Sequence, residues 1–352
     1  MRPPMLRPLL AAVAAFLAAA PALAETPAEA SSAVVLMYHR FGESGIPSTN
    51  IRAEQFARHL EKLEKGGYRV APLEEIAAAI KAGRPIPPKT VAITVDDAYA
   101  SALTVAWPML KARGWPMTIF VATAPVDHGT HGYLTWDQLR GMAKEGVTIG
   151  AHSETHPHMA KLPADEAAAE IARSNARFQA ELGFVPKLFA YPYGEASTDT
   201  IAAARKAYDA AFGQHSGVAD ASDDPYFLPR FALNERYGDD DRFRVIVGAL
   251  PLPVADVTPA SPTLADNPPN FGFTVTDPGL PLRNLRCYAT PETKTTTEIL
   301  GNRVEVRMDK PFPGTRGRLN CTLPGRDGQR WHWYGRLFYI PEGVRLPGVK
   351  DD

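Results

Sequence analysis

The sequence shows no charge excess, only two cysteines and no glycine-rich nucleotide-binding loop. Its 352 residues carry 38 Lys and Arg against 39 Asp and Glu, a formal net charge of −1. Nucleic-acid-binding domains usually carry a basic excess, so this balance argues against that class. The missing glycine-rich loop after any strand-like run disfavours a dinucleotide-binding sheet. The function must therefore be sought in the polar motifs.

The first 24 residues have the layout of a secretory signal peptide. Arg2 and Arg7 form a positive start, residues 9–20 an apolar stretch, and residues 22–24 a small-residue cleavage site before Glu25. The apolar stretch is shorter than the roughly 20 residues that cross a bilayer, although an uncut anchor is the alternative. We therefore expect an exported mature protein, periplasmic or secreted, without a membrane span.

The two cysteines, Cys287 and Cys321, lie near the C-terminal end of the chain. In an oxidising compartment we expect such a pair to form a disulfide rather than a metal or catalytic site. Closing the loop between them would stabilise the fold by about 3–4 kcal/mol. Two free thiols are the alternative.

Residues 32–250 alternate short apolar runs with helix-like segments. Such alternation predicts a parallel sheet with helical crossovers, and near-continuous apolar strands indicate a sheet that is buried on both faces. The length is close to the roughly 250 residues of a (β/α) barrel. We predict an α/β barrel, with an open doubly wound sheet as the competitor. The expected strands are 34–38, 91–95, 117–122, 147–151 and 188–191, and the expected helices include 136–144, 164–182 and 198–208.

The composition and periodicity of the sequence change after residue 250. Residues 251–269 contain six prolines and little helical periodicity, which predicts a stiff linker. Residues 270–345 contain short β-rich runs separated by turn residues, at about the size of an immunoglobulin-like module. We predict a small β-sandwich in which Cys287 and Cys321 join two strands.

Asp96 and Asp97 directly follow the apolar run 91–95. Active sites of barrels and parallel sheets form at the C-terminal ends of strands. Neighbouring strand residues point to opposite faces, so both carboxylates serve one site only if the strand ends there and the backbone turns. An aspartate that caps the next helix is the alternative for either one.

His152 and His156 follow the apolar run 147–151. Pro157 disfavours a helical conformation at His156, so we expect a tight loop or a single turn. Two neutral imidazoles and one carboxylate suit zinc or a similar divalent ion and leave a position open for water. A pair of histidines four positions apart is common by chance, and its weight comes from the strand before it and the aspartates upstream.

A third cluster, Tyr191-Pro192-Tyr193-Gly194, follows the apolar run 188–191. Aromatic residues around Pro and Gly often form nothing more than a packed turn. A functional version would offer a backbone N–H from the turn to a developing oxyanion.

Together, Thr94-Val95-Asp96-Asp97, His152-Ser153-x-x-His156 and Tyr191-Pro192-Tyr193-Gly194 resemble the first three motifs of the NodB-like polysaccharide deacetylases, carbohydrate esterase family four. The start Leu36-Met37-Tyr38-His39-Arg40 is similar to the branch that deacetylates poly-N-acetylglucosamine. The resemblance implies a distorted (β/α) barrel, a zinc, cobalt or nickel ion, and hydrolysis of N-acetyl or sometimes O-acetyl groups. It implies Asp96 as general base, Asp97, His152 and His156 as metal ligands, and the backbone N–H of Tyr193 as an oxyanion donor.

The sequence departs from the family in its leaving-group acid. Many members carry a late Leu-x-x-His motif, and the surroundings of His215, the late histidine of this region, do not match it. The resemblance to the poly-N-acetylglucosamine branch implies His39 as the acid, with a structural histidine as the alternative. Arg230 resembles an arginine that pairs with the catalytic carboxylate, and an ordinary salt bridge is the alternative. His158 is interpreted as a bystander.

In the second domain, Trp331 and Trp333 should share one face of a strand and His332 and Tyr334 the other. We expect the tryptophans to pack in the sandwich core rather than stack on sugar. The sequence thus predicts an enzyme that removes N-acetyl groups from an N-acetylglucosamine-containing polymer. A polysaccharide O-acetyl esterase and a catalytically silent, exported glycan-binding protein are the alternatives.

Overall fold

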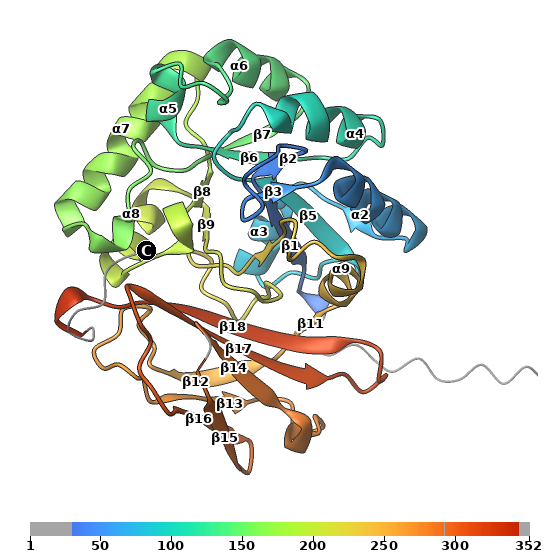
Figure 1. Cartoon of the computed structure of the whole chain (residues 1–352), viewed down its shortest axis with the longest axis vertical. Helices are drawn as coiled ribbons and strands as arrows, with labels where there is room; N and C mark the ends of the chain where they lie inside the picture. Colours follow the sequence, from blue (N-terminus) through green and yellow to red (C-terminus); the bar gives the residue numbers. More distant parts are fainter. Residues whose placement is uncertain (1–29, 292, 345–352) are drawn as a thin grey trace, which may run out of the picture.

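The computed structural model describes residues 30–291 and 293–344, and its N-terminal part is built on one parallel sheet (Figure 1). The predicted signal peptide, residues 1–24, lies outside the described residues. The sheet has eight strands in the order β10-β1-β5-β6-β7-β8-β9, with β4 paired to β5 off this path. The strands are β1 (Val34–Tyr38), β4 (Arg69–Val70), β5 (Thr90–Val95), β6 (Thr118–Val121), β7 (Thr148–Ala151), β8 (Leu188–Ala190), β9 (Ala210–Phe212) and β10 (Phe231–Ala232).

Helices cover the outside of this sheet (Figure 1). They are α2 (Ala53–Lys65), α3 (Leu73–Lys81), α4 (Trp107–Lys111) with a preceding π-helix η1 (Ala102–Ala106), α5 (Thr123–Asp127), α6 (Trp136–Lys144), α7 (Ala164–Leu182), α8 (Thr198–Ala207) and α9 (Asp240–Val247). Local signals set their ends: Thr135 and Gln138 form a capping box at the start of α6, and Gly183 ends α7 in a left-handed conformation. No helix of the described ranges combines the length and apolarity that a membrane crossing needs.

The sheet curves but does not close, because the edge strands β9 and β10 are not paired with each other in the ladder. β1 and β5 are buried along their whole length, as expected for parallel strands that carry side chains on both sides. A two-stranded sheet, β2 (Arg40–Phe41) with β3 (Asn50–Ile51), lies after β1. The predicted α/β class and the distorted (β/α) barrel are confirmed.

The C-terminal part is all β and forms two four-stranded sheets. One has the order β11-β18-β17-β14 and the other β12-β13-β16-β15. Cys287 in β14 and Cys321 in β17 are direct cross-strand partners and form a disulfide, so the predicted bridge is confirmed. The strands are β11 (Leu250–Pro251), β12 (Val254–Thr258), β13 (Phe271–Val275), β14 (Arg286–Thr290), β15 (Thr295–Leu300), β16 (Arg303–Met308), β17 (Arg316–Pro324) and β18 (Trp331–Tyr339), with short 3₁₀ turns η4 (Leu282–Asn284) and η5 (Glu342–Val344).

Part of the segment expected to be a stiff linker has regular structure. Within residues 251–269, β12 pairs antiparallel with β13, and β11 runs parallel to β18. Prolines are compatible with edge strands, where one row of N–H groups needs no partner. Both β11 and β12 are edges of their sheets, so the proline-rich sequence forms the borders of the sandwich. The boundaries of the predicted domains remain a prediction.

The sandwich packs against the barrel through the sheet that holds β17 and β18 (Figure 1). Trp333 of β18 lies edge-on to Phe231 of β10, with 5.1 Å between ring centroids. Trp331 is exposed, whereas His332 is buried and Tyr334 packs on the sandwich core. The expectation of tryptophans in the sandwich core is therefore wrong, because the face that they share meets the barrel and solvent.

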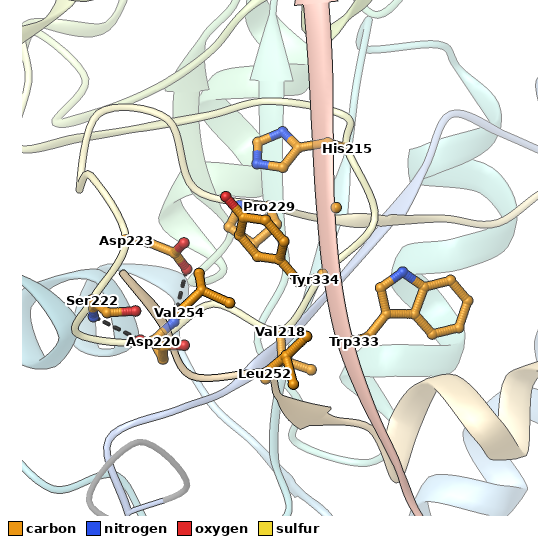
Figure 2. A pocket seen from close by; sticks show the side chains of 12 residues that line it. His215, Val218, Asp220, Ser222, Asp223, Pro229, Leu252, Val254, Trp333 and Tyr334 are labelled. Atoms are coloured by element: carbon orange, nitrogen blue, oxygen red, sulfur yellow. Dashed lines mark hydrogen bonds between the residues drawn. The ribbon is translucent and has the colours of Figure 1, made fainter. Parts of the chain in front are cut away.

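A small polar cavity lies in this interface, between β18 and the barrel loop that contains His215 (Figure 2). Its volume of about 20 Å³ is enough for about one water molecule. Asp220 and Asp223 line it and are tied together, because the backbone N–H of Asp220 donates to Asp223 Oδ2 at 3.1 Å. The cavity is a packing feature of the interface, too small for a sugar.

Candidate active site

The backbone turns sharply where β5 ends, and this turn brings two neighbouring carboxylates into one site. Asp97 and Ala98 both have positive φ, at 72° and 59°. Non-glycine residues in this conformation cost on the order of 1–3 kcal/mol each, so the surroundings must hold them there. The N–H of Asp96 still donates to Tyr38 O at 2.9 Å, as the last bond of the ladder. Asp96 therefore remains in the sheet while Asp97 leaves it.

The loop after β7 holds His152 and His156, in the tight turn that Pro157 predicts. Ser153 and His156 have positive φ, and the N–H of His156 donates to Ser153 Oγ at 3.1 Å. Glu170 of α7 fixes the middle of the loop by accepting hydrogen bonds from the backbone N–H groups of Glu154 and Thr155, at 3.1 and 2.9 Å. The two imidazoles thus sit on a braced loop.

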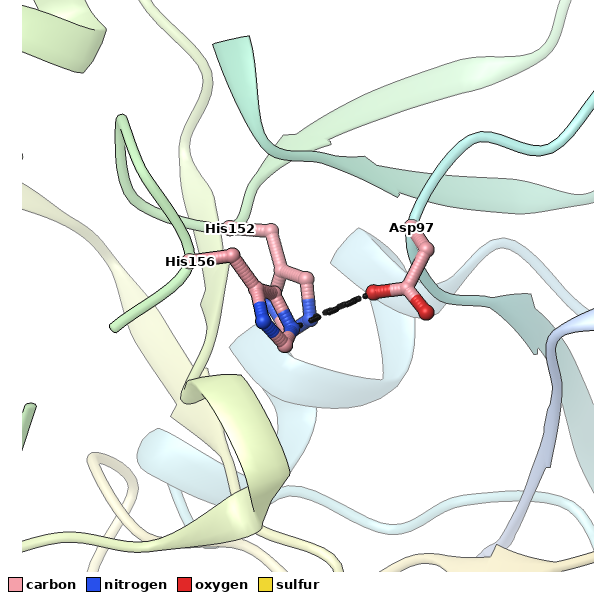
Figure 3. Close-up of side chains that lie close together, drawn as sticks. All are labelled: Asp97, His152 and His156. Carbon is pink, nitrogen blue, oxygen red and sulfur yellow. Dashed lines mark ion pairs between the residues drawn. The ribbon is translucent and has the colours of Figure 1, made fainter. Parts of the chain in front are cut away.

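Asp97, His152 and His156 converge on one point (Figure 3). The Nε2 atoms of His156 and His152 lie 3.2 and 3.4 Å from Asp97 Oδ1, and the three ligand atoms lie within 4.8 Å of one another. Nitrogen, nitrogen and carboxylate oxygen are a donor set that divalent ions such as zinc accept. The fold thus brings together the three side chains that the sequence predicted as metal ligands.

His152 offers the clearest test of whether this site fits a metal. Its Nδ1 donates to Ala190 O at 2.7 Å, which leaves Nε2 as the lone-pair atom. That Nε2 is buried and has no hydrogen-bond partner within the described ranges. Two lone pairs facing each other, on Nε2 and on Asp97 Oδ1, need a cation or a proton between them. The residues present therefore fit a divalent ion.

The pKa shifts of Asp97 and His152 also indicate that the site favours a bound positive charge. Burial by itself raises the pKa of Asp97, but His152 and His156 hold it well below its usual range. Burial lowers the pKa of His152, yet the neighbouring Asp97 and Asp96 carboxylates raise it above its ordinary value. A proton and a metal ion compete for this position, so metal affinity should weaken in acid.

Asp96 is neutralised in another way, by a buried arginine. Arg230 Nη1 and Nη2 donate to Asp96 Oδ1 and Oδ2 at 2.6 and 2.8 Å, and neither side chain is exposed. Arg230 also donates through Nε to Gly213 O at 2.9 Å and through Nη1 to Thr94 Oγ1 at 3.1 Å. Gln214 Nε2 approaches Asp96 Oδ2 at 3.4 Å. The pairing that the sequence suggested for Arg230 is present, in bidentate form.

The ion pair determines the charge of Asp96. Burial alone would raise the pKa of Asp96, but the Arg230 guanidinium more than offsets it and the pKa lies below its ordinary value. Asp96 is therefore ionised at neutral pH. Arg230 takes one lone pair on each carboxylate oxygen and Gln214 approaches Oδ2, so Oδ1 keeps a second lone pair for a proton.

A cavity of about 890 Å³ opens above these residues, at the upper end of the range for ligand sites. His39, Asp97, His156 and Tyr193 line it, together with residues of the second domain. Tyr38 points the other way, into the core, and its hydroxyl contacts His59 Nδ1 at 3.0 Å. The alternation after β1 thus places His39 in the cavity, as expected.

His215 is not brought into this cavity. It is buried beside Phe227, and burial together with nearby arginines lowers its pKa to about 3. A histidine with that pKa is neutral at physiological pH and a poor proton donor. The mismatch of its surroundings in the sequence is consistent with this position.

Tyr193 lies in the turn η3 (Pro192–Gly194) with φ 59°. Its ring stands edge-on to His156 at 4.7 Å and stacks on His158 at 4.0 Å. The first N–H groups of a helical turn have no partner within it, so the Tyr193 N–H is of the kind that binds an oxyanion. Sequence reasoning dismissed His158, which in fact supports the Tyr193 ring.

His158 itself is anchored by a buried glutamate. Its Nδ1 lies 2.8 Å from Glu195 Oε2, and Glu195 is fully buried. Arg316 of β17 lies 3.6 Å from the other Glu195 oxygen, so this chain of contacts runs from His156, a predicted metal ligand, to the second domain. Two features of the sequence could have indicated this contact. His158 lies two positions after His156, and Glu195 directly follows Gly194.

Comparison with known proteins agrees with this geometry. Residues 83–209 match the polysaccharide deacetylase family. A putative polysaccharide deacetylase of Bacillus subtilis, YxkH, is 28% identical over 201 residues, which cover 57% of this chain and 71% of that protein. The structure of IcaB from Ammonifex degensii superposes with a TM-score of 0.54 at 27% identity, covering 59% of this chain and 94% of that one. The chain therefore contains a polysaccharide deacetylase domain, as the motifs in the sequence predict, and is a hydrolase.

One of the similar proteins is named for the reaction that it catalyses. The poly-β-1,6-N-acetyl-D-glucosamine N-deacetylase of Escherichia coli K12 is 26% identical over 244 residues. The match covers 57% of this chain but only 36% of that enzyme's length. Amide bonds are thus within the reach of this family.

Proposed function

We propose that the protein is an exported, metal-dependent N-deacetylase of an N-acetylglucosamine-containing polymer. The observation that carries the proposal is the buried, unpartnered Nε2 of His152, aimed with His156 at the Asp97 carboxylate. Zinc suits this donor set best, and cobalt or nickel are acceptable substitutes. The disulfide supports export, because such bonds persist in oxidising compartments.

In this proposal Asp97, His152 and His156 hold the ion. The chemistry that a bound divalent cation supplies is a lowered pKa of water and polarisation of the acetyl carbonyl. Asp96, kept ionised by Arg230, accepts the proton of the attacking water as general base. Arg230 is a positioning residue, because it touches the base and is fully buried.

Two further groups complete the reaction. The Tyr193 N–H donates to the oxygen on which negative charge develops, and its turn is braced by His158 and Glu195. His39 lines the cavity beside Asp97 and donates a proton to the departing amine. An amide needs this proton far more than an ester does, because an amine anion is a poor leaving group.

The test is acetate release from β-1,6- and β-1,4-linked N-acetylglucosamine oligomers, with and without a chelator. We expect release that the chelator stops and added zinc, cobalt or nickel restores. Release from acetylxylan alone would identify an O-acetyl esterase. If no acetylated glycan is hydrolysed at any metal loading, the protein is a silent binding protein and the proposal is wrong.

His39→Ala separates the amide and ester readings within one protein. We expect kcat on N-acetylated oligomers to fall by about 10²–10⁴-fold, while activated acetyl esters lose far less. The exposed His128→Ala serves as the matched control. Equal losses on both substrate types would contradict the role of His39 as leaving-group acid.

A further inference from the structure

The second domain forms one wall of the catalytic cavity. Arg316, Arg318 and Asn320 of β17 and Trp333 of β18 line the same cavity as Asp97 and His156. The three β17 residues alternate with buried Gly317, Leu319 and Cys321, so they share the face of the sheet that looks at the barrel. Any polymer bound over the metal ligands therefore also meets the sandwich.

This wall is held against the barrel at defined contacts. Arg316 reaches Glu195, and Trp333 packs on Phe231 while its Nε1 donates to Asn320 Oδ1 at 3.2 Å. The backbone of β18 comes so close at Gly335 that a Cβ there would lie 2.0 Å from Ser216 O. The side chains of the wall are thus placed by the fold rather than by a mobile linker.

The charge of the cavity differs in sign from that of the chain. The sequence has a formal net charge of −1, yet the cavity is lined by Arg242, Arg316 and Arg318 against the single carboxylate Asp97. A divalent ion held with the two neutral histidines would neutralise Asp97. Arg242 donates to the carbonyls of Ala232 and Tyr237. On β17, Arg316 is offset by the buried Glu195 carboxylate, so the uncompensated guanidinium of this strand is that of Arg318.

Arg318 is the unusual member of this set. No hydrogen bond or ion pair joins its side chain to another residue in the part of the chain that the structure describes. Burial and the neighbouring Arg316 lower its pKa to about 10, which leaves it charged at neutral pH. A guanidinium has five N–H donors, and a half-buried charge without acceptors is costly. A bound anion would supply the missing acceptors.

We propose that Arg318, with Arg316 beside it, binds a carboxylate of the polymer, so that the substrate is an acidic polysaccharide in which uronic acid units neighbour the acetylated amino sugar. The planar guanidinium matches a carboxylate in bidentate geometry. Alternate β17 residues place the two guanidinium stems about 7 Å apart on one face, which suits a chain with repeating charges. Sugar hydroxyls would satisfy donors but not the charge. The proposal rests on the proposed function for the acetylated amino sugar.

The test uses matched oligomers that differ only in the anion. One alternates glucuronic acid with N-acetylglucosamine, the second is the same oligomer with its carboxylates reduced to hydroxymethyl groups, and the third is that reduced oligomer carrying sulfate. We expect the wild type to prefer the carboxylated over the reduced oligomer by about 10- to 100-fold in kcat/KM. Arg318→Gln should bring this ratio close to one, mainly through KM, and Arg318→Lys should recover it in part. Arg307→Gln, an exposed arginine of β16 in the other sheet, should leave the ratio unchanged.

Three outcomes would overturn the proposal. One is equal kcat/KM for the carboxylated and reduced oligomers in the wild type, and another is an equal loss on both in Arg318→Gln. A third is acetate release from plain N-acetylglucosamine oligomers but from none of the three matched oligomers. A preference for the sulfated oligomer would overturn the uronic acid assignment. If the plain oligomers release no acetate either, the proposed function fails instead, and calorimetry decides the anion site. Binding of the carboxylated oligomer that Arg318→Gln weakens at least tenfold would support it, and equal binding of all three would overturn it.

Discussion

The barrel side and the sandwich side of the cavity handle buried charge in opposite ways. On the barrel side both carboxylates face groups of the same domain: Arg230 neutralises Asp96, and His152 and His156 lie 3.4 and 3.2 Å from Asp97. On the sandwich side, Arg318 has a place in the cavity but no partner within the described residues. A carboxylate that is paired inside the protein keeps one protonation state, which a catalytic group needs. A guanidinium without an acceptor is stabilised most when a ligand supplies one.

The difference separates two tasks. The barrel side holds the proposed base Asp96 ionised and the proposed ligands in place, as catalysis requires before the substrate arrives. The sandwich side carries donors that only a bound polymer satisfies, as recognition requires. If this division is correct, changes on the barrel side should abolish turnover, and changes on the sandwich side should alter which polymer is used.

Asp96→Asn should have the largest effect on turnover. Losing the base should lower kcat by about 10²–10⁴-fold while metal content stays near that of the wild type. The variant also leaves Arg230 as an unpaired buried charge, which costs about 3–5 kcal/mol of stability. Thermal unfolding, acetate release and elemental analysis measure the three effects, with the exposed Asp137→Asn as control.

The double variant Asp96→Asn/Arg230→Gln separates stability from catalysis. Removing both charges should recover much of the lost stability, because a buried pair that is replaced as a pair costs little. Turnover should stay low. Recovery of turnover together with stability would show that Asp96 acts through the fold and not as a base.

Most residues on the barrel side of the cavity could be identified from the sequence, because each one lies directly after the strand that positions it. Asp96, Asp97, His152 and His156 each follow a continuous apolar run, and such runs end at the same edge of a parallel sheet. Even the turn at Asp97 was expected as a condition for using both carboxylates. In contrast, β10 has only two residues and depends on its pairing with β1. Strands of that kind leave no periodic signal.

The roles of the residues on the sandwich side could not be predicted from the sequence, because they depend on contacts between segments that are distant in the chain. Alternation along β18 correctly paired Trp331 with Trp333, but it does not say whether their face meets the core or another domain. His158 gains its role from Glu195, 37 residues away. Arg318 has no motif at all. The residues proposed to recognise the polymer are thus the ones that no sequence pattern indicated.

His152→Ala tests the barrel side through metal binding. Loss of a ligand should weaken metal affinity by more than the roughly 10–100-fold that outer-shell changes cost. Metal content after dialysis, measured by elemental analysis, should fall well below that of His128→Ala. Undiminished metal content would mean that the three side chains in Figure 3 are not the ligands.

Gly335→Ala tests the sandwich side by moving the wall as a whole. A Cβ 2.0 Å from the backbone oxygen of Ser216 cannot be accommodated unless β18 and the barrel shift apart. We expect kcat/KM on the polymer to fall about tenfold, with unchanged metal content and faster proteolysis between the domains. Gly343→Ala, where a Cβ meets nothing within 4 Å, is the control. Normal kcat/KM in Gly335→Ala would mean that the wall does not contribute to binding.

Asp223→Asn should have the smallest effect, on stability alone. Burial and the neighbouring Asp220 carboxylate raise the pKa of Asp223 well above its ordinary value in the interface cavity (Figure 2). The folded protein therefore binds this proton more tightly than the unfolded chain, so stability falls as pH rises from about 4 toward the raised pKa. Asparagine removes the cost of ionisation, and we expect unfolding at pH 8 to require about 1 kcal/mol more than in the wild type. The gain should shrink near pH 4, and the exposed Asp266→Asn should show neither effect. A gain that is the same at both pH values would mean that the ionisation of Asp223 does not weaken the contact between barrel and sandwich.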